Sequence, residues 1–205
     1  MKMPVQLAEG VALEEYNALG PQDVDSVGDM FTDYLLEEFR RLGEMAFGNP
    51  VAGYLTTWII RCDGADAGFV SLDSDKHAVE LIYVKPEFRG RGFARMVLQE
   101  LRTYKPQTLA LKTPLSPGGE ALLEQLQLDR ADNFPHEVAK NEEALQTILE
   151  SIKKGCPHTK KKQGGDPRKP CRRCYQTGLR RYATVVVLQH AGTSRMMSGR
   201  YRPGG

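Results

Sequence analysis

One stretch constrains the fold more than any other: residues 82–101 read IYVKPEFRGRGFARMVLQEL, a strand-like run that bends into a helix-like one. The apolar run ends at Pro86, and two glycines and two arginines follow in RGRGFA. Glycine permits left-handed turns and a close approach of ligands to the backbone amides. The first amides of a helix lack internal partners and lie at the positive end of its dipole, which suits a phosphate group. The stretch therefore predicts a phosphate-binding bend, and a plain connection with two solvated arginines is the alternative.

The segments around this bend predict an α/β domain. Before it, the turns DGAD and DSDK separate three short apolar runs, which is typical of an antiparallel meander. A helical spacing of apolar residues follows Gly20, and another begins at Phe93. The expected strands cover residues 11–16, 55–62, 68–72, 78–84 and 108–113, and the later helices cover residues 93–103 and 120–126.

The bend carries a family signature. Arg89, Gly92 and Ala94 match the RxxGxG/A motif of the GNAT acetyltransferases, and YVKPEF resembles that family's lead-in to the motif. The order of elements over residues 11 to about 128 also resembles the family plan. The resemblance implies a GNAT fold, with a central mixed, mostly antiparallel sheet flanked by helices and closed by a strand at 182–188. It also implies an N-acetyltransferase that moves an acetyl group from acetyl-CoA to a primary amine.

The resemblance further implies where acetyl-CoA binds. The backbone amides of the bend would hold the CoA pyrophosphate, and the end of the preceding strand would run beside the pantetheine arm. An amide near Val84 would point at the thioester oxygen, where a fixed N–H stabilises the negative charge that builds during attack. The expected donor-binding residues are Ile82, Tyr83, Val84, Arg89, Gly90, Arg91, Gly92, Phe93 and Ala94.

An acceptor amine must also lose a proton, because an alkylamine with a pKa of about 10.4 is mostly protonated at neutral pH. Glu80 has the same strand parity as Ile82 and Val84, so we expect its carboxylate to face the cleft and take that proton directly or through water. The alternative is an acid on an edge of the sheet. Weaker alternative bases nearby are His77, Asp73 and Asp75.

The proton that the departing thiolate takes up has no obvious source. Many GNAT enzymes carry a tyrosine in the helix after the fifth strand, but Leu123 stands at that place here, and PLSPGG replaces a frequent asparagine. We expect Tyr182 or Ser116 to supply the proton, or the thiolate to leave unaided, since a thiol has a pKa near 8.5. A binding protein that has lost catalysis is a further alternative.

A second motif lies between residues 153 and 181. Twelve residues separate the pair Cys156 and His158 from the pair Cys171 and Cys174. Two ligand pairs joined by a short loop suit a closed, tetrahedral structural Zn²⁺ site, although CxH is a less usual pair than CxxC. The alternative is three free cysteines and a lone histidine in a loop. Because the segment has few apolar residues, we favour zinc as the means by which it folds.

The same segment is strongly basic. It holds eleven Lys or Arg residues and one acid, a net +10, and since the whole chain is +2, the rest carries −8. This segregation predicts a nucleic acid partner gripped through its phosphates, with an acidic protein or an acidic face of the chain itself as the alternative. The acceptor amine would then lie on an amine-bearing modified base, as in phage DNA, or on tRNA. A protein lysine or N-terminus is the alternative acceptor, with the zinc module as a docking element.

We therefore expect a GNAT core at residues 1–134, a helix at 135–152 and a basic zinc-ribbon-like module at 153–181 inserted before the last strand. The closing strand of the core is expected at 182–190 and a flexible basic tail at 191–205. The sequence holds no run of 18 apolar residues, and its N-terminus lacks the apolar stretch of a secretory signal. A cytoplasmic protein without a membrane segment is expected, and the oligomeric state is left open.

Overall fold

The computed structural model describes residues 4–42, 51–105 and 107–132, together with residues 143, 147, 150, 177, 178, 180 and 181. The predicted zinc ligands, the strand at 182–188 and the tail lie outside these residues. Within the predicted helix at 135–152, the three described residues are helical.

The described strands form one mixed, mostly antiparallel sheet, as predicted. Strands β1 to β5 pair antiparallel in chain order, and β6 and β7 then add in parallel. The meander is confirmed: Asp63 and Gly64 join β3 to β4 with φ of 50° and 79°, the left-handed pair that a tight hairpin requires. The strands are β1 Val5–Ala8, β2 Val11–Glu15, β3 Leu55–Cys62, β4 Ala65–Asp73, β5 Ala78–Val84, β6 Ala110–Lys112 and β7 Asp129–Ala131. The short edge strands β1 and β7 were not predicted.

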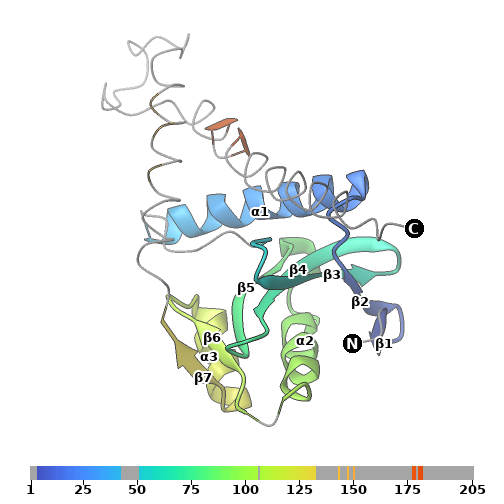
Figure 1. The fold of residues 1–205 in the computed structure, drawn as a ribbon, viewed down its shortest axis with the longest axis vertical. Helices are drawn as coiled ribbons and strands as arrows, with labels where there is room; N and C mark the ends of the chain where they lie inside the picture. The colour runs from blue at the N-terminus through green and yellow to red at the C-terminus, as the bar shows by residue number, and fades with distance from the viewer. Residues whose placement is uncertain are drawn as a thin grey trace, which may run out of the picture.

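Helices cover both faces of the sheet (Figure 1). Helix α1, Pro21–Leu42, packs its apolar side on one face, against Ile59, Phe69 and Leu81 among others. Helices α2, Phe93–Arg102, and α3, Pro117–Leu126, pack on the other face with a larger apolar cluster. A short 3-10 turn, Pro86–Phe88, leads from β5 into the bend before α2. The fold therefore has three layers, with the sheet between two layers of helices.

The sheet opens between β5 and β6. These strands pair at Ala78 with Ala110 and at Val79 with Leu111, whereas β5 runs on to Val84. A β-bulge lies at this point, because Leu72 and Ser71 of β4 face Val79 and Leu81, which leaves Glu80 as an extra residue in β5. The bulge and the short pairing together leave the second half of β5 without β6 as a neighbour.

Candidate active site

The bend between β5 and α2 has the geometry of an anion site. Gly90 and Gly92 take left-handed conformations, with φ of 78° and 81°, and a Cβ at either position would meet nothing within 4 Å. No side chain caps α2, and its first internal hydrogen bond runs from Met96 N–H to the Gly92 carbonyl, at 3.0 Å. The amides of residues 93–95 therefore have no partner within the helix, and open space lies beside both glycines.

A hollow of about 430 Å³ lies at this bend. Its volume falls within the range of small-ligand sites. It is lined by Val84, Phe88, Arg89, Gly90, Gly92, Phe93, Ala94, Arg95 and Leu122. The structure thus gathers most of the predicted donor-binding residues around one hollow and adds Leu122 of α3, which the sequence did not suggest.

The side chain of Arg89 is engaged by other groups of the protein and is not a free phosphate ligand. Its Nε donates to the Val84 carbonyl at 2.8 Å, and its Nη2 pairs with Oε2 of Glu37 on α1 at 2.7 Å. Its guanidinium also lies over the ring of Tyr83, 5.5 Å from the centroid, and the Tyr83 hydroxyl donates to Glu37 at 3.3 Å. We name these four residues the Glu37 brace. Sequence reasoning missed Glu37, because nothing in a helix pattern shows which acid reaches across to the bend.

The backbone of β5 presents alternate residues to the opening. Lys85 N–H donates to the Ala67 carbonyl at 2.9 Å. Because antiparallel pairing alternates, the polar groups of Tyr83 and Leu81 also face β4, while those of Ile82 and Val84 face away from it. The predicted backbone contacts along residues 82–84 are therefore available only at Ile82 and Val84. The amides of these two residues lie on the side of β5 where β6 is no longer paired.

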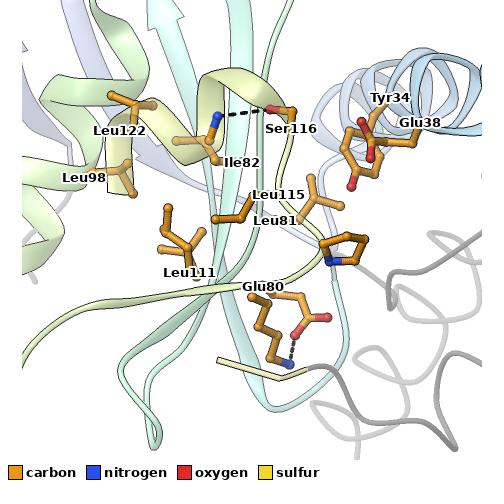
Figure 2. Close-up of a pocket in the computed structure, with 14 residues that line it drawn as sticks. Tyr34, Glu38, Glu80, Leu81, Ile82, Leu98, Leu111, Leu115, Ser116 and Leu122 are labelled. Carbon is orange, nitrogen blue, oxygen red and sulfur yellow. Dashed lines mark hydrogen bonds and ion pairs between the residues drawn. The ribbon is translucent and has the colours of Figure 1, made fainter. Parts of the chain in front are cut away.

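A second, smaller cavity of about 80 Å³ fills that opening (Figure 2). Tyr34 and Glu38 enter it from α1, and Figure 2 shows them across the cavity from Leu98, Leu111 and Leu122. Its full lining comprises Tyr34, Glu38, Val79, Glu80, Leu81, Ile82, Leu98, Leu111, Lys112, Pro114, Leu115, Ser116, Gly119 and Leu122. Leu122 also lines the hollow at the bend, so this residue borders both spaces.

Glu80 lines this cavity together with Ile82. The bulge lies at Glu80, so strict alternation along β5 does not determine the side of the strand on which its carboxylate lies. Its carboxylate forms an ion pair with Lys112 Nζ of β6, and both side chains are almost completely buried. Lys112 was not singled out in the sequence, although a lysine that ends a short apolar strand was a signal of such pairing.

Acidic and phenolic groups of α1 complete the polar side of the cavity. Glu38 accepts from Arg41 Nε at 3.1 Å, and Arg41 Nη1 donates to the Leu115 carbonyl at 3.0 Å, which ties α1 to the loop before α3. Burial raises the pKa of Tyr34 well above its usual range, and the nearby charge of Glu38 raises it further. The Tyr34 phenol therefore keeps its proton at neutral pH.

Of the predicted proton donors, Ser116 lies at the cavity. Its hydroxyl oxygen caps α3 by accepting from Gly119 N–H at 3.1 Å. Leu123, at the place where many GNAT enzymes carry tyrosine, packs into the apolar cluster. Tyr182 lies outside the described residues.

The weaker alternative bases lie at the end of β4 and in the turn that follows it, and they line neither cavity. Oδ1 of Asp73 accepts from the amides of Asp75 at 3.2 Å and Lys76 at 3.1 Å, so it shapes the turn. His77 is fully buried, and neither ring nitrogen has a hydrogen-bond partner in the described part of the chain.

Neither a metal centre nor a membrane span is found in the residues that the structure describes. Those residues contain no group of three or more His, Cys, Asp or Glu side chains arranged to hold a metal ion. Cys62 is free and buried. No helix in the described ranges is both long and apolar enough to cross a membrane.

The match to a family model agrees with this fold. Residues 53–146, just under half of the chain, match the family model for an acetyltransferase (GNAT) domain. One similar solved structure is an acetyl transferase from Salmonella typhimurium that modifies the N-terminal serine of the 50S ribosomal subunit protein L7/L12. The two share 15% identity over 59% of this chain and 81% of that one, with a TM-score of 0.41. No curated protein matches the chain. The described sheet and its helices thus form a GNAT-like α/β fold with a matching GNAT acetyltransferase domain.

Proposed function

We propose that this protein is an acetyl-CoA-dependent N-acetyltransferase that acts on a primary amine. One observation carries the proposal: the hollow at the bend and the cavity where β5 and β6 part are neighbours that share Leu122 as a lining residue. A donor whose pyrophosphate rests on the amides near Gly92 would reach that cavity with its thioester. The outward amides of Ile82 and Val84 lie along the way.

The chemistry that such a site supports is direct acyl transfer. The amine nitrogen attacks the thioester carbon, the C–N bond forms, and charge builds on the thioester oxygen, where the Val84 N–H is proposed to stabilise it. The C–S bond then breaks and releases CoA. The amine loses one proton and the thiolate gains one, so the reaction needs no other co-reactant.

We retain Glu80 as the proposed base, acting directly or through water. Its carboxylate lines the cavity, where it forms a buried ion pair with Lys112. Ser116 remains a proposed proton source for the thiolate because its hydroxyl hydrogen is not used by the bond it accepts from Gly119. Tyr182 remains the other proposed proton source.

For the acceptor, we propose an amine presented by nucleic acid, gripped by the basic module at 153–181 and folded by Zn²⁺ on Cys156, His158, Cys171 and Cys174. The net +10 of that segment supports this partner. A protein lysine or N-terminus is the second candidate, and one observation favours it. Asp25, Asp29 and Asp33 form an exposed acidic row on α1, four residues apart, which suits a cationic segment better than a phosphodiester.

The test is acetyl transfer by the full chain from labelled acetyl-CoA to DNA, tRNA and a library of basic peptides. We expect label in nuclease-digestible material, and Glu80→Gln should lower the rate by about 100-fold. Glu124→Gln, an exposed acid on α3, is the matched control and should leave the rate unchanged. Label in peptides alone would select the second candidate. Acetyl-CoA binding without transfer to any acceptor would favour a binding protein instead.

A further inference from the structure

The polar side of the cavity between β5 and β6 carries charges that cancel. Among the described residues that line this cavity, the charged side chains are those of Glu38, Glu80 and Lys112. Glu80 pairs with Lys112, and only 1% and 2% of these two side chains are exposed. Glu38 pairs with Arg41, which lies one turn further along α1 and does not line the cavity. Each carboxylate at the cavity therefore already has a cation of the protein as its partner.

The pair of Glu38 and Arg41 is held at two points. Arg41 Nε donates to Glu38 Oε1 at 3.1 Å, and Arg41 Nη2 donates to Glu38 Oε2. Arg41 Nη1 donates to the Leu115 carbonyl at 3.0 Å, so the guanidinium is also fixed to the loop before α3. Bidentate pairs between arginine and a carboxylate are among the stronger hydrogen-bonded contacts in proteins. Both oxygens of Glu38 are thus engaged, which makes this carboxylate a poor counter-ion for an incoming ammonium group.

We propose that the acceptor is a weakly basic primary amine, such as the α-amine of an amino-acid residue, and not an alkylamine. The inference rests on the proposed function and names its class of amine, whichever of the proposed carriers presents it. A cavity whose charges already cancel offers no counter-ion to an alkylammonium group, and burial of an unpaired charge is costly. An amine that is uncharged before it enters avoids this cost.

The two classes of amine differ strongly in the fraction that is uncharged. An α-amino group has a pKa of about 7.7–8.0, whereas the amine of a lysine has a pKa of about 10.4. At pH 7.4 about a quarter of the α-amine is uncharged, against about one part in a thousand of the lysine amine. The Tyr34 phenol and the Ser116 hydroxyl, which also line the polar side, are uncharged groups as well. The polar lining therefore matches a neutral amine better than a cation.

The experiment compares the two classes of amine on the same carrier. The full chain receives labelled acetyl-CoA and either a peptide with one free α-amine and one lysine, or tRNA that carries an aminoacyl α-amine or an aminoalkyl base. Mass spectrometry locates the acetyl group, and the ratio of transfer to the α-amine over transfer to the alkylamine is measured on each carrier. At pH 7.4 we expect the wild type to favour the α-amine by at least about 100-fold.

Charge variants separate the preference of the protein from the reactivity of the amines, because every variant meets the same substrates. Arg41→Gln leaves Glu38 able to pair with an alkylammonium group, so the ratio should fall at least about tenfold. Glu38→Gln leaves the Arg41 cation unpaired and should raise the ratio. The double variant Glu38→Gln/Arg41→Gln removes both charges and should return the ratio to within about threefold of the wild type. Arg102→Gln, an exposed residue in the last turn of α2, is the control and should leave the ratio unchanged.

The outcomes distinguish the acceptor class from the proposed function. Circular dichroism shows that each variant is folded. Transfer by the wild type to the alkylamine as fast as to the α-amine would overturn the acceptor class and leave the proposed function standing. Ratios that stay unchanged in folded Arg41→Gln and Glu38→Gln would also overturn it, because the preference would then belong to the amines themselves. Failure of the folded wild type to acetylate any acceptor would overturn the proposed function and the acceptor class together.

Discussion

Burial determines the charge state of His77. Its side chain is fully buried in the turn that precedes β5, where its carbonyl accepts from Ala110 N–H at 3.0 Å. Removal from water lowers the pKa of His77, and the nearby charge of Lys105 lowers it further. The imidazole is therefore neutral in the folded protein at neutral pH, which suits a ring whose nitrogens lack partners.

This state predicts a pH dependence of stability. An unfolded histidine has a pKa of about 6.5, and the folded value lies below it, so the unfolded state binds more protons as the pH falls. The contribution of His77 to stability is therefore full above about pH 6.5 and is lost as the pH falls toward its folded pKa. His77→Asn should reduce the loss of stability at low pH, because asparagine does not titrate. Asparagine also tolerates the φ of 52° at this position.

Urea denaturation at about pH 7.5 and about pH 5.5 measures this effect. The difference between the two free energies of unfolding should be smaller in His77→Asn than in the wild type. Other groups that titrate in this range are common to both proteins and cancel in the comparison. An equal difference in the two proteins would show that His77 titrates in the same way in the folded and unfolded states.

At the scale of elements, the Glu37 brace links helix α1 to the bend. Glu37 contacts both Tyr83 and Arg89, and Arg89 in turn holds the Val84 carbonyl. Burial raises the pKa of Tyr83 well above its usual range, and the charge of Glu37 adds to the rise, so the phenol stays a donor to Glu37. The brace thus fixes the end of β5, whose Val84 amide is proposed to meet the thioester.

Glu37→Gln should therefore weaken donor binding more than it weakens the fold. The Glu37 and Arg89 side chains are 34% and 46% exposed, so solvent screening limits the loss in stability to about 1 kcal/mol or less. A loosened bend should raise the Kd for acetyl-CoA by about three- to tenfold. Titration calorimetry measures the affinity, and thermal melts measure the stability. Asp25→Asn, an exposed acid on the same helix, is the control and should leave both unchanged.

A double-mutant cycle with Arg89→Lys decides whether the two residues act together. If they do, the double variant should lose no more affinity than the worse single variant. Additive losses would show that Arg89 contacts the donor independently of Glu37.

The elements themselves could be predicted from sequence to different degrees. The meander and the bend were predictable because DGAD and RGRGFA place glycines where the backbone needs left-handed turns. The bulge at Glu80 was not, since an extra residue in a strand leaves no mark on an apolar pattern. The bulge also affected the prediction of the candidate site, because the side of the strand assigned to Glu80 depended on strict alternation. The Lys112 pair and the Glu37 brace join residues distant in sequence, which periodicity cannot reveal.

At the scale of the whole molecule, charge is divided between two parts of the chain. The segment at 153–181 is strongly basic, whereas the rest is acidic, with an exposed row of aspartates on α1. Described residues of the two parts interact electrostatically, since the charge of Arg180 acts on the Asp33 carboxyl. Partial withdrawal from water nevertheless raises the pKa of Asp33, and the like charge of Asp29 adds to the rise. A polyanion bound at Arg180 would therefore compete with the Asp33 carboxylate for the charge of this arginine.

The proposed zinc module predicts a metal-dependent change in this segment. Purified full-length protein should contain about one zinc ion per chain, and removal by a chelator should expose residues 153–181 to protease, because a segment so poor in apolar residues relies on its metal to fold. Hydrogen exchange should show that the loss of protection is confined to that segment. Cys171→Ser should cause the same loss of zinc and of protection, whereas Cys62→Ser, which changes the buried free cysteine of β3, should retain the zinc. Metal-free protein with an unchanged exchange pattern would rule the module out.

The proposed nucleic acid grip makes its own prediction at this scale. If about five phosphates are contacted, the logarithm of the binding constant should fall with the logarithm of salt concentration with a slope near −4. Fluorescence anisotropy with a short labelled duplex measures the slope. Binding that does not decline with salt would contradict a phosphate contact surface.

The central claim is that the bend before α2 holds the phosphates of acetyl-CoA, and Gly92 tests it most directly. Gly92 and Gly64 have nearly the same φ, 81° and 79°, and open space beside both, so valine at either position meets similar backbone strain of about 1–3 kcal/mol. Gly92 lies in the bend, whereas Gly64 lies in the turn between β3 and β4. Calorimetric titration of acetyl-CoA should show wild-type affinity in Gly64→Val and at least a tenfold loss, about 1.4 kcal/mol, in Gly92→Val. Equal affinities in the two folded variants, or no binding to the wild type, would contradict the claim.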